Sequence, residues 1–376
     1  MLTKYEDIVD TPHDGYFRLG LRSHGKGTFH SFVEKGKELE TAKMQRVEAN
    51  KFILNITFAW EHAVAITDEN DKGKLVSHRF PQFSLDESLS PKFLKFLILD
   101  NNFRHYLELC SPGGAGRNRV LNISDMLKYK ILVPQISEQQ KIGSFFDKID
   151  NTITLQQRKL NSLQKLKKGL LQKMFPKNGE NIPEIRFPEF SDAWKQRKLR
   201  EVVKEFYNGQ TPYRQNKAYW GGNVNWLASG DLNRGVVTNT IEKITEEGQK
   251  ASRLRIIPKG TLVIAIMGLE AAGTRGNCCI LGINTTINQA CMALIANESI
   301  ATKDFLFQWY KAFGNSLALK FTQGTKQQNY NEELLGNLDI SYPSLKEQQQ
   351  IGSFFTQLDN TITLQQRWLF YTHKQS

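Results

Sequence analysis

The sequence predicts an α+β fold, in which two mixed α/β domains alternate with two long helices that pair as an antiparallel coiled coil. The first observation behind this prediction is an internal repeat, because the stretch Glu138–Arg158 returns as Glu347–Arg367 with only four differences. The second is a heptad pattern of apolar residues in both copies. The third is a shared order of strand-like and helix-like runs before each copy. Such a repeat indicates a duplicated unit with one structural role.

Apolar residues recur in both copies at alternating steps of four and three, the pattern of a helix that packs along another helix. Gln156 and Lys167 interrupt this series in the first copy, and Gln365 stands where the first copy has Gln156. A polar residue at such a position costs stability and can fix the register of the pair. A tolerated substitution is the alternative. We expect helix pairing through Ile142, Phe146, Ile149, Ile153, Gln156 and Leu160, and through Ile351, Phe355, Leu358, Ile362, Gln365 and Leu369.

Each repeated helix contains a glycine near its start, Gly143 and Gly352. Glycine inside a helix costs about 1 kcal/mol relative to alanine. Close approach of another helix would account for that cost. The first helix is expected from about Glu138 to Met174, where Pro176 and the polar residues that follow it end the pattern.

The net charge of +12 and the pI of about 9.4 favour a polyanionic partner such as nucleic acid. The four cysteines have no C-x-x-C spacing, which indicates neither a zinc site nor a disulfide framework. The chain opens on polar and acidic residues, and its longest apolar run, Thr261–Gly268, is too short to cross a membrane. We therefore expect a cytoplasmic protein.

The two globular segments follow one plan, which gives four predicted parts: residues 1–133, 134–178, 179–342 and 343–376. In the first segment we expect strands at Phe52–Trp60, Ala63–Thr67 and Tyr129–Val133, and a helix at Pro91–Leu109. In the second we expect strands at Gly260–Met267, Gly276–Leu281 and Leu338–Tyr342, and a helix at Thr302–Phe321.

The chain resembles a known family, the DNA-specificity (HsdS) subunit of type I restriction–modification systems. The resemblance covers nearly the whole chain. It rests on the repeated helices with the tail Leu163–Phe175, on the block Ile182–Trp194, and on Asn55–His62 with Leu75–Pro81.

The resemblance implies two target-recognition domains, 1–133 and 179–342, that each read half of a bipartite site on double-stranded DNA. The helices would set the spacing between the half-sites and dock two modification (methyltransferase) subunits. Restriction subunits with translocase and endonuclease activity would join the complex. S-adenosylmethionine, ATP and Mg²⁺ are expected on those partners and no cofactor on this chain, which would itself be non-catalytic.

The sequence departs from this pattern in two places. Residues 183–224 have no counterpart before Gly15, so the first domain is expected to be short at its N-terminus. After Arg367 the chain does not repeat the residues that follow Arg158, so the second helix is expected to be short. A truncated or rearranged allele that acts only as an assembly scaffold is the alternative.

Motifs of self-contained enzymes are missing from the sequence. The stretch Gly20–Thr28 superficially resembles a phosphate-binding loop, but glycine follows its lysine and no helix pattern comes after it. A methyltransferase would need a glycine-rich cofactor loop and an Asn-Pro-Pro-aromatic motif, and neither is present. The histidines have no metal-ligand spacing and are expected in the core or on the surface, so no metal site is predicted.

Arginine, lysine, asparagine and glutamine are the side chains whose geometry suits base edges and phosphates. For any one candidate, a solvated surface charge or a phosphate contact is favoured over a contact with a base. The loop 324–330 is the favoured single site. The candidates for DNA contact are Arg22, His24, Lys26, Arg79, Arg117 and Arg119 in the first domain, and Arg214, Asn233, Arg234, Arg275, Lys326, Gln327, Gln328 and Asn329 in the second.

Overall fold

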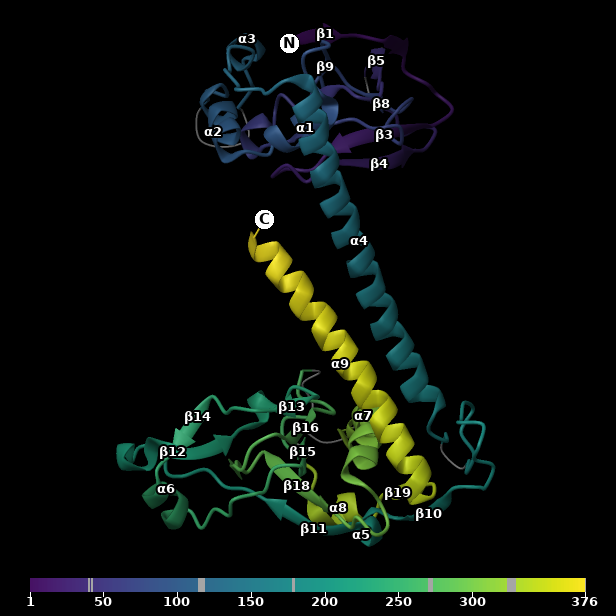
Figure 1. Cartoon of the computed structure of the whole chain (residues 1–376), viewed down its shortest axis with the longest axis vertical. Coiled ribbons are helices and arrows are strands. Elements are labelled where there is room, and N and C mark those ends of the chain that lie inside the picture. The colour runs from purple at the N-terminus through teal and green to yellow at the C-terminus, as the bar shows by residue number, and fades with distance from the viewer. Residues whose placement is uncertain are drawn as a thin grey trace. The chain divides into compact units, whose positions relative to one another are not determined.

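The computed structural model of the chain describes residues 1–39, 41, 43–113, 119–177, 180–269, 273–322 and 329–375. They form two compact units, Met1–Leu155 and Gln156–Ser376. The division falls inside α4 (Ile136–Lys173), the first long helix; the second is α9 (Leu345–Gln375) (Figure 1). The bounds of α4 confirm the predicted helix. The division into four parts stays a prediction. Within these ranges, no helix has the length and apolar character needed to cross a membrane.

The first unit contains a four-stranded sheet in the order β1-β9-β6-β7, with antiparallel neighbours throughout. Its strands are β1 (Leu2–Tyr5), β6 (Phe52–Leu54), β7 (Val64–Ile66) and β9 (Gln82–Leu85). A second sheet, β2-β5-β8-β3-β4, is built from β2 (Ile8–Asp10), β3 (Tyr16–Leu21), β4 (Thr28–Val33), β5 (Lys43–Arg46) and β8 (Leu75–Val76). The short helices are η1 (Ala59–Glu61), α1 (Pro91–Leu97), α2 (Asn101–Leu109) and α3 (Ile123–Met126).

The main sheet of the second unit has the strand order β11-β18-β15-β16-β13. Its first four strands repeat the four-stranded sheet of the first unit, and β13 is an additional strand. These strands are β11 (Val203–Asn208), β13 (Val236–Val237), β15 (Leu262–Ala265), β16 (Cys278–Leu281) and β18 (Cys291–Ala296). One smaller sheet consists of β12 (Trp220–Leu227), β14 (Glu242–Ile244) and β17 (Thr286–Ile287). Another pairs β10 (Lys195–Lys198) with β19 (Asp339–Tyr342). The helices are α5 (Leu199–Val202), η2 (Lys217–Tyr219), η3 (Ser229–Asp231), α6 (Glu246–Ala251), α7 (Lys303–Thr322) and α8 (Glu332–Gly336).

The two units share one strand order in their main sheets, β1-β9-β6-β7 and β11-β18-β15-β16. The central strand β15 is buried on both faces, which explains why its sequence reads as an unbroken apolar run. Leu262 and Ile264 belong to the core under α7, while Val263 and Ala265 face the opposite cluster. Burial raises the pKa of the Cys278 thiol in the neighbouring strand to about 12, as expected for a structural cysteine. The predicted duplication of the globular plan is thus confirmed.

A buried glutamine joins each long helix to its globular part. In the first unit the Gln139 carboxamide accepts a hydrogen bond from Ser90 N (2.9 Å) and donates to Ser88 O and Pro134 O, each at 2.8 Å. In the second unit Gln348 accepts from Thr302 N and donates to Ile300 O and Pro343 O, each at 2.9 Å. Both glutamines are 0% exposed. We call these two arrangements the glutamine clamps.

The helix glycines stand where a second helix comes close, as predicted. A Cβ atom on Gly143 would lie 2.6 Å from the Cβ of Lys92 in α1, and one on Gly352 would lie 2.8 Å from the Cβ of Asp304 in α7. In each unit, therefore, the close partner is the first turn of the unit's own helix, and not the other long helix.

Polar residues of α4 and α9 meet inside the second unit. Gln365 donates a 2.7 Å hydrogen bond from its side chain to the Gln156 carboxamide oxygen. Asp359 forms ion pairs with Lys167 of α4 and with Lys311 of α7. The burial of the Lys311 ammonium lowers its pKa to about 8. The two residues that interrupt the heptad series of α4 are therefore the ones that find polar partners on α9. Coiled-coil pairing over the remaining length stays a prediction.

Three of the expected helix-pairing positions also contact the globular part beside their helix. Ile351 and Phe355 are 1% and 0% exposed and belong to the core of the second unit, which contains Phe305 of α7 and against which Leu170 of α4 packs. Phe146 stacks on Phe96 of the first unit, with ring centroids 4.9 Å apart. These positions follow the heptad spacing and also pack on the globular part next to each helix, so their role in helix pairing stays a prediction.

Several predicted elements of the first unit are shorter than expected. β6 ends at Leu54, since the residues after it form a turn. The predicted helix Pro91–Leu109 is two helices, because the Asp100 side chain caps α2 by accepting from Asn102 N. Residues 129–133 form no strand, whereas the corresponding β19 pairs with β10.

We expect Gln348→Ala to lower the free energy of unfolding by about 3 kcal/mol, because it leaves buried backbone groups without partners. Urea unfolding would measure this change. The exposed neighbour Gln349 supplies the control: Gln349→Ala should stay within about 0.5 kcal/mol of the parent. Equal effects from the two variants would show that the clamp does not hold the second unit together.

Candidate nucleic-acid interface

A turn of residues 55–62 follows strand β6 in the first unit. Its side chains fix its shape: Asn55 Oδ1 accepts hydrogen bonds from the backbone N and the hydroxyl of Thr57, at 3.0 and 2.7 Å. Trp60 Nε1 donates to Thr57 O at 3.1 Å. His62 is buried and its Nε2 lies 2.7 Å from Ile98 O. Burial lowers the pKa of His62, which favours a neutral ring that donates to this carbonyl. The prediction of a core histidine is confirmed at this position.

The loop between β3 and β4 is fastened to this turn. His24 N donates to Glu61 O at 2.7 Å, and Gly25 N donates to His62 O at 2.8 Å. His24 has φ of 63°, a left-handed conformation that the loop requires. A hairpin strand follows the loop, so the phosphate-loop reading of Gly20–Thr28 fails here as the sequence indicated. The side chains of Arg22, His24 and Lys26 are exposed.

Two further arginines reach the same turn. Ile56 donates its N–H to Arg79 O at 3.0 Å and accepts from Leu121 N at 2.8 Å. The Arg119 guanidinium lies 5.4 Å from the centroid of the Trp60 ring. The structure therefore brings together all the candidates of the first unit that it describes; Arg117 lies outside the described residues. We call Arg22, His24, Lys26, Arg79 and Arg119 the first basic rim.

The second unit builds the corresponding place in the same way. Ile266 N donates to Ala290 O and Ile266 O accepts from Tyr330 N, both at 2.9 Å, which repeats the pattern at Ile56. Arg234 Nη2 donates to Arg275 O at 2.8 Å, and Arg275 Nε donates to Leu269 O at 3.1 Å. Arg275 lies on the turn that follows β15, and Arg234, which precedes β13, is hydrogen-bonded to it. Asn233 adjoins Arg234 and its Oδ1 accepts from Gly235 N, while Asn329 adjoins Tyr330.

The remaining candidates of the second unit fall outside this arrangement. Lys326, Gln327 and Gln328, the centre of the favoured loop 324–330, lie outside the described residues. Arg214 does not join this arrangement: its guanidinium binds both oxygens of Glu242, at 2.5 and 2.9 Å, and lies 3.9 Å from the Trp220 ring centroid. Its contact with DNA stays a prediction. The sequence around Arg214 does not indicate this partner, because Glu242 lies 28 residues further along the chain.

The chemistry of the two turns suits a polyanion. Each turn carries cationic and amide side chains on a backbone held by hydrogen bonds to neighbouring segments, and such groups bind phosphates and base edges. Across the described ranges, no group of His, Cys, Asp and Glu side chains could hold a metal ion. Trp60 is the site residue that the sequence reasoning did not select; its signal was an aromatic residue within a polar turn.

Comparison with known proteins places these features in a family. Residues 24–165 and 191–369 match the family model described as the type I restriction modification DNA specificity domain. The specificity subunit of the type I restriction enzyme MjaIX from Methanocaldococcus jannaschii is 28% identical over 173 residues, which are 45% of this chain and 38% of that protein. The EcoR124I/EcoR124II specificity subunit from Escherichia coli is 27% identical over 185 residues, 48% of this chain and 44% of that protein. The chain thus spans less than half the length of these two relatives.

Two solved structures share the fold. The HsdS subunit from Thermoanaerobacter tengcongensis has a TM-score of 0.51 at 15% identity, and the alignment covers 98% of this chain and 91% of that one. The S subunit of a type I restriction–modification system from M. genitalium has a TM-score of 0.54 at 15% identity, with coverage of 97% and 93%.

Replacing Lys26 by alanine should weaken binding to any duplex about equally and lower the salt dependence by about one counterion, because an exposed lysine contacts phosphate without reading sequence. Fluorescence anisotropy with duplexes of different sequence would measure both effects. Lys35, also exposed and beyond the far end of β4, gives the matched control Lys35→Ala. Similar losses for the two variants would contradict the placement of the interface at the first basic rim.

Proposed function

We propose, from the premise that the chain belongs to the type I restriction–modification DNA specificity family, that it selects the DNA sequence on which a type I complex acts. The observation that carries this proposal is the duplicated turn: Ile56 and Ile266 are held by the same pair of backbone hydrogen bonds, and basic residues surround both. Two similar cationic surfaces on one chain suit a reader of two half-sites.

Each unit would read one half of a bipartite site on double-stranded DNA. The side chains of the first basic rim are arginine, lysine and histidine, while the second turn adds asparagine to arginine. Arginine suits guanine and asparagine suits adenine in the major groove. The difference between the two sets supports different half-sites, with backbone phosphates contacted on both.

The long helices would dock two modification subunits and set the distance between the half-sites. In the second unit, α9 leaves Leu364 65% exposed, Phe370 56% exposed and Tyr371 65% exposed. Apolar side chains gathered on an exposed helix are typical of protein–protein contact. The methyltransferase subunits would carry S-adenosylmethionine, and restriction subunits with ATP and Mg²⁺ would join them. This chain would be non-catalytic and would act in the cytoplasm, where those partners meet the DNA.

Assembly without sequence selection is the alternative function. A scaffold would need the helices and the glutamine clamps but would not need two basic rims on separate turns. The clustering of Arg22, His24, Lys26, Arg79 and Arg119 around one turn therefore favours a reader.

We expect co-expression with modification subunits of a matching type I system to produce adenine or cytosine methylation at one bipartite motif with a constant gap. Single-molecule sequencing of the host DNA would detect it. A purified complex with these subunits that methylates DNA without a motif would contradict the proposal and favour a scaffold. A catalytically dead modification subunit is the control for background methylation.

A further inference from the structure

Arg119 differs from the other cations of the first basic rim in how its guanidinium is held. The group lies 5.4 Å from the centroid of the Trp60 ring, within the range of a cation–π contact. Its Nη1 atom is 3.6 Å from Glu108 Oε1, which is too far for a hydrogen bond. Toward the residues that the structure describes, the Arg119 side chain donates no hydrogen bond. The guanidinium is thus held in place while its N–H donors remain unused.

The ring that supports Arg119 is itself fixed. Trp60 Nε1 donates to Thr57 O at 3.1 Å, and the Asn55 side chain accepts from the backbone N and the hydroxyl of Thr57. Asn55 is 9% exposed. Because this turn sets the orientation of the indole, it also orients the guanidinium that lies on it. An arginine that is ordered before binding loses less conformational freedom when it contacts a ligand.

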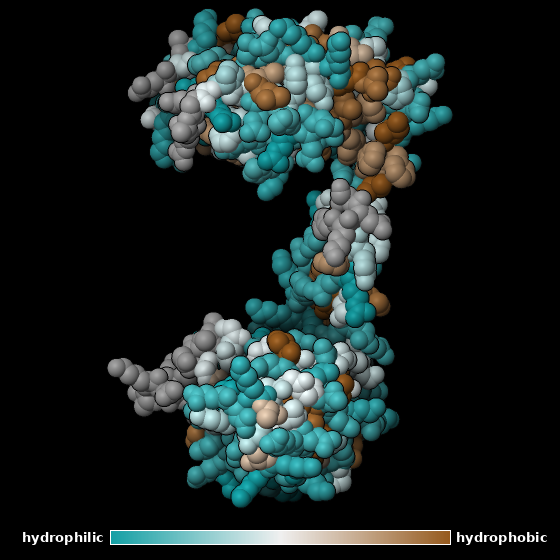
Figure 2. All heavy atoms as spheres, turned by 90° about the vertical axis from the view of Figure 1, so that its left-hand side faces the viewer, coloured by the Kyte–Doolittle hydropathy of each residue, from teal (hydrophilic) through white to brown (hydrophobic). Residues whose placement is uncertain are grey.

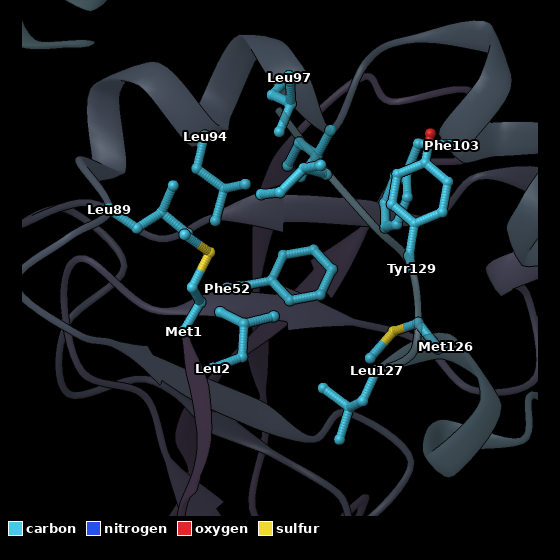
Figure 3. Close-up of a pocket in the computed structure, with 12 residues that line it drawn as sticks. Met1, Leu2, Phe52, Leu89, Leu94, Leu97, Phe103, Met126, Leu127 and Tyr129 are labelled. Carbon is cyan, nitrogen blue, oxygen red and sulfur yellow. The ribbon is translucent and has the colours of Figure 1, made fainter. Parts of the chain in front are cut away.

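The backbone next to Arg119 and the helix beside it are anchored as well. Leu121 N donates to Ile56 O at 2.8 Å, which joins the segment to the turn. α2 is held through Phe103, whose ring centroid lies 5.1 Å from that of Tyr129. Figure 3 shows these two rings side by side. The support of the guanidinium therefore extends from the turn into the core of the first unit.

Other arginines of the two turns donate hydrogen bonds within the protein. Arg22 Nη1 donates to a backbone carbonyl of its own hairpin at 2.5 Å. In the second unit, the adjacent Nε and Nη2 of Arg234 donate to Asn277 Oδ1 and Arg275 O, at 3.2 and 2.8 Å. These bonds use N–H groups that a base would otherwise receive. Arg119 combines a supporting ring with unused donors.

The Arg119 side chain is open to solvent on part of its surface, with 32% exposed. Figure 2 looks onto the side of the first unit that carries α2, and the surface there is mostly hydrophilic. Such a surface suits contact with a hydrated duplex. A planar guanidinium presents two parallel N–H groups, which match the O6 and N7 acceptors of guanine in the major groove.

We propose that Arg119 is the side chain by which the first unit reads a guanine, through paired hydrogen bonds to O6 and N7, and that Trp60 positions it. The exposed cations around it, such as Lys26, then contact phosphates without selecting a base. This inference rests on the proposed function and deepens it, because it names one base of the first half-site and the residue that reads that base.

The test uses the full chain in a complex with modification subunits and a library of randomised duplexes. One position of one half-site should be guanine in the motif that the parent selects. Arg119→Ala should reduce the preference for guanine there at least about fivefold, as loss of a bidentate pair requires. The other half-site and the gap should stay unchanged, which shows that the variant folds and assembles. Arg104→Ala removes an exposed arginine of α2 and is the matched control that should leave the motif unchanged.

A modified base tests the contact itself. A duplex with 7-deazaguanine at this position lacks the N7 acceptor but keeps the Watson–Crick pair. Fluorescence anisotropy should show that the parent complex binds it at least about threefold more weakly than the unmodified duplex. The Arg119→Ala complex should bind both duplexes equally, because the two changes remove the same interaction.

The positioning role of Trp60 has a separate readout. Trp60→Leu should weaken the preference for the same guanine, because the guanidinium loses the ring that orients it. Trp60→Phe should retain most of that preference, since it keeps an aromatic face for the cation. A purely structural role would instead lower the affinity for all duplexes alike and leave the base preference unchanged.

The outcomes separate this inference from the proposed function. A motif that Arg119→Ala leaves unchanged at every position, or an equal loss of affinity on every duplex, would overturn the inference and leave the proposed function standing. A parent complex that assembles but selects no motif would overturn the proposed function and this inference with it.

Discussion

A buried carboxamide at the start of each long helix holds the structure together. Gln139 and Gln348 each satisfy one backbone N–H and two backbone carbonyls, which belong to the globular part and to the segment that enters the helix. Within the part of the chain that the structure describes, those buried groups find no other hydrogen-bond partner. The glutamine therefore fixes the angle between helix and globular part, and the adjacent glycine lets a second helix come close. The direction of each helix from its globular part follows from this junction.

The constant junction leaves the rest of each unit free to differ. The two main sheets share a strand order, yet the turns after β6 and β15 carry different side chains on the same backbone hydrogen bonds. Within the second unit, the partly buried ion pairs of Asp359 with Lys167 and Lys311 join three helices, where removal of one partner would leave a charge unpaired. The two units thus share a backbone arrangement but carry different side chains on it, which suits a pair of readers for different half-sites.

The repeat allowed the helices and the duplicated plan to be predicted, because identical residues such as Gly143 and Gly352 meet the same constraint. Heptad spacing could not show that Ile351 and Phe355 enter a globular core, since both environments select apolar residues at the same positions. The expected strand at residues 129–133 has suitable residues, but among the described residues it pairs with no strand. Clustering of the first basic rim was not visible either, because long-range backbone pairing brings together residues as distant as His24 and Glu61. The ion pair of Arg214 with Glu242 was not visible for the same reason.

We propose that the two units read their half-sites independently of each other. Exchange of residues 184–341 for the equivalent segment of another specificity subunit, in a complex with modification subunits, tests it most directly. Sequencing of the methylated DNA should show that one half of the motif changes while the other half and the gap stay as they were. A change in both halves, or in the gap, would contradict independent readers on a common frame.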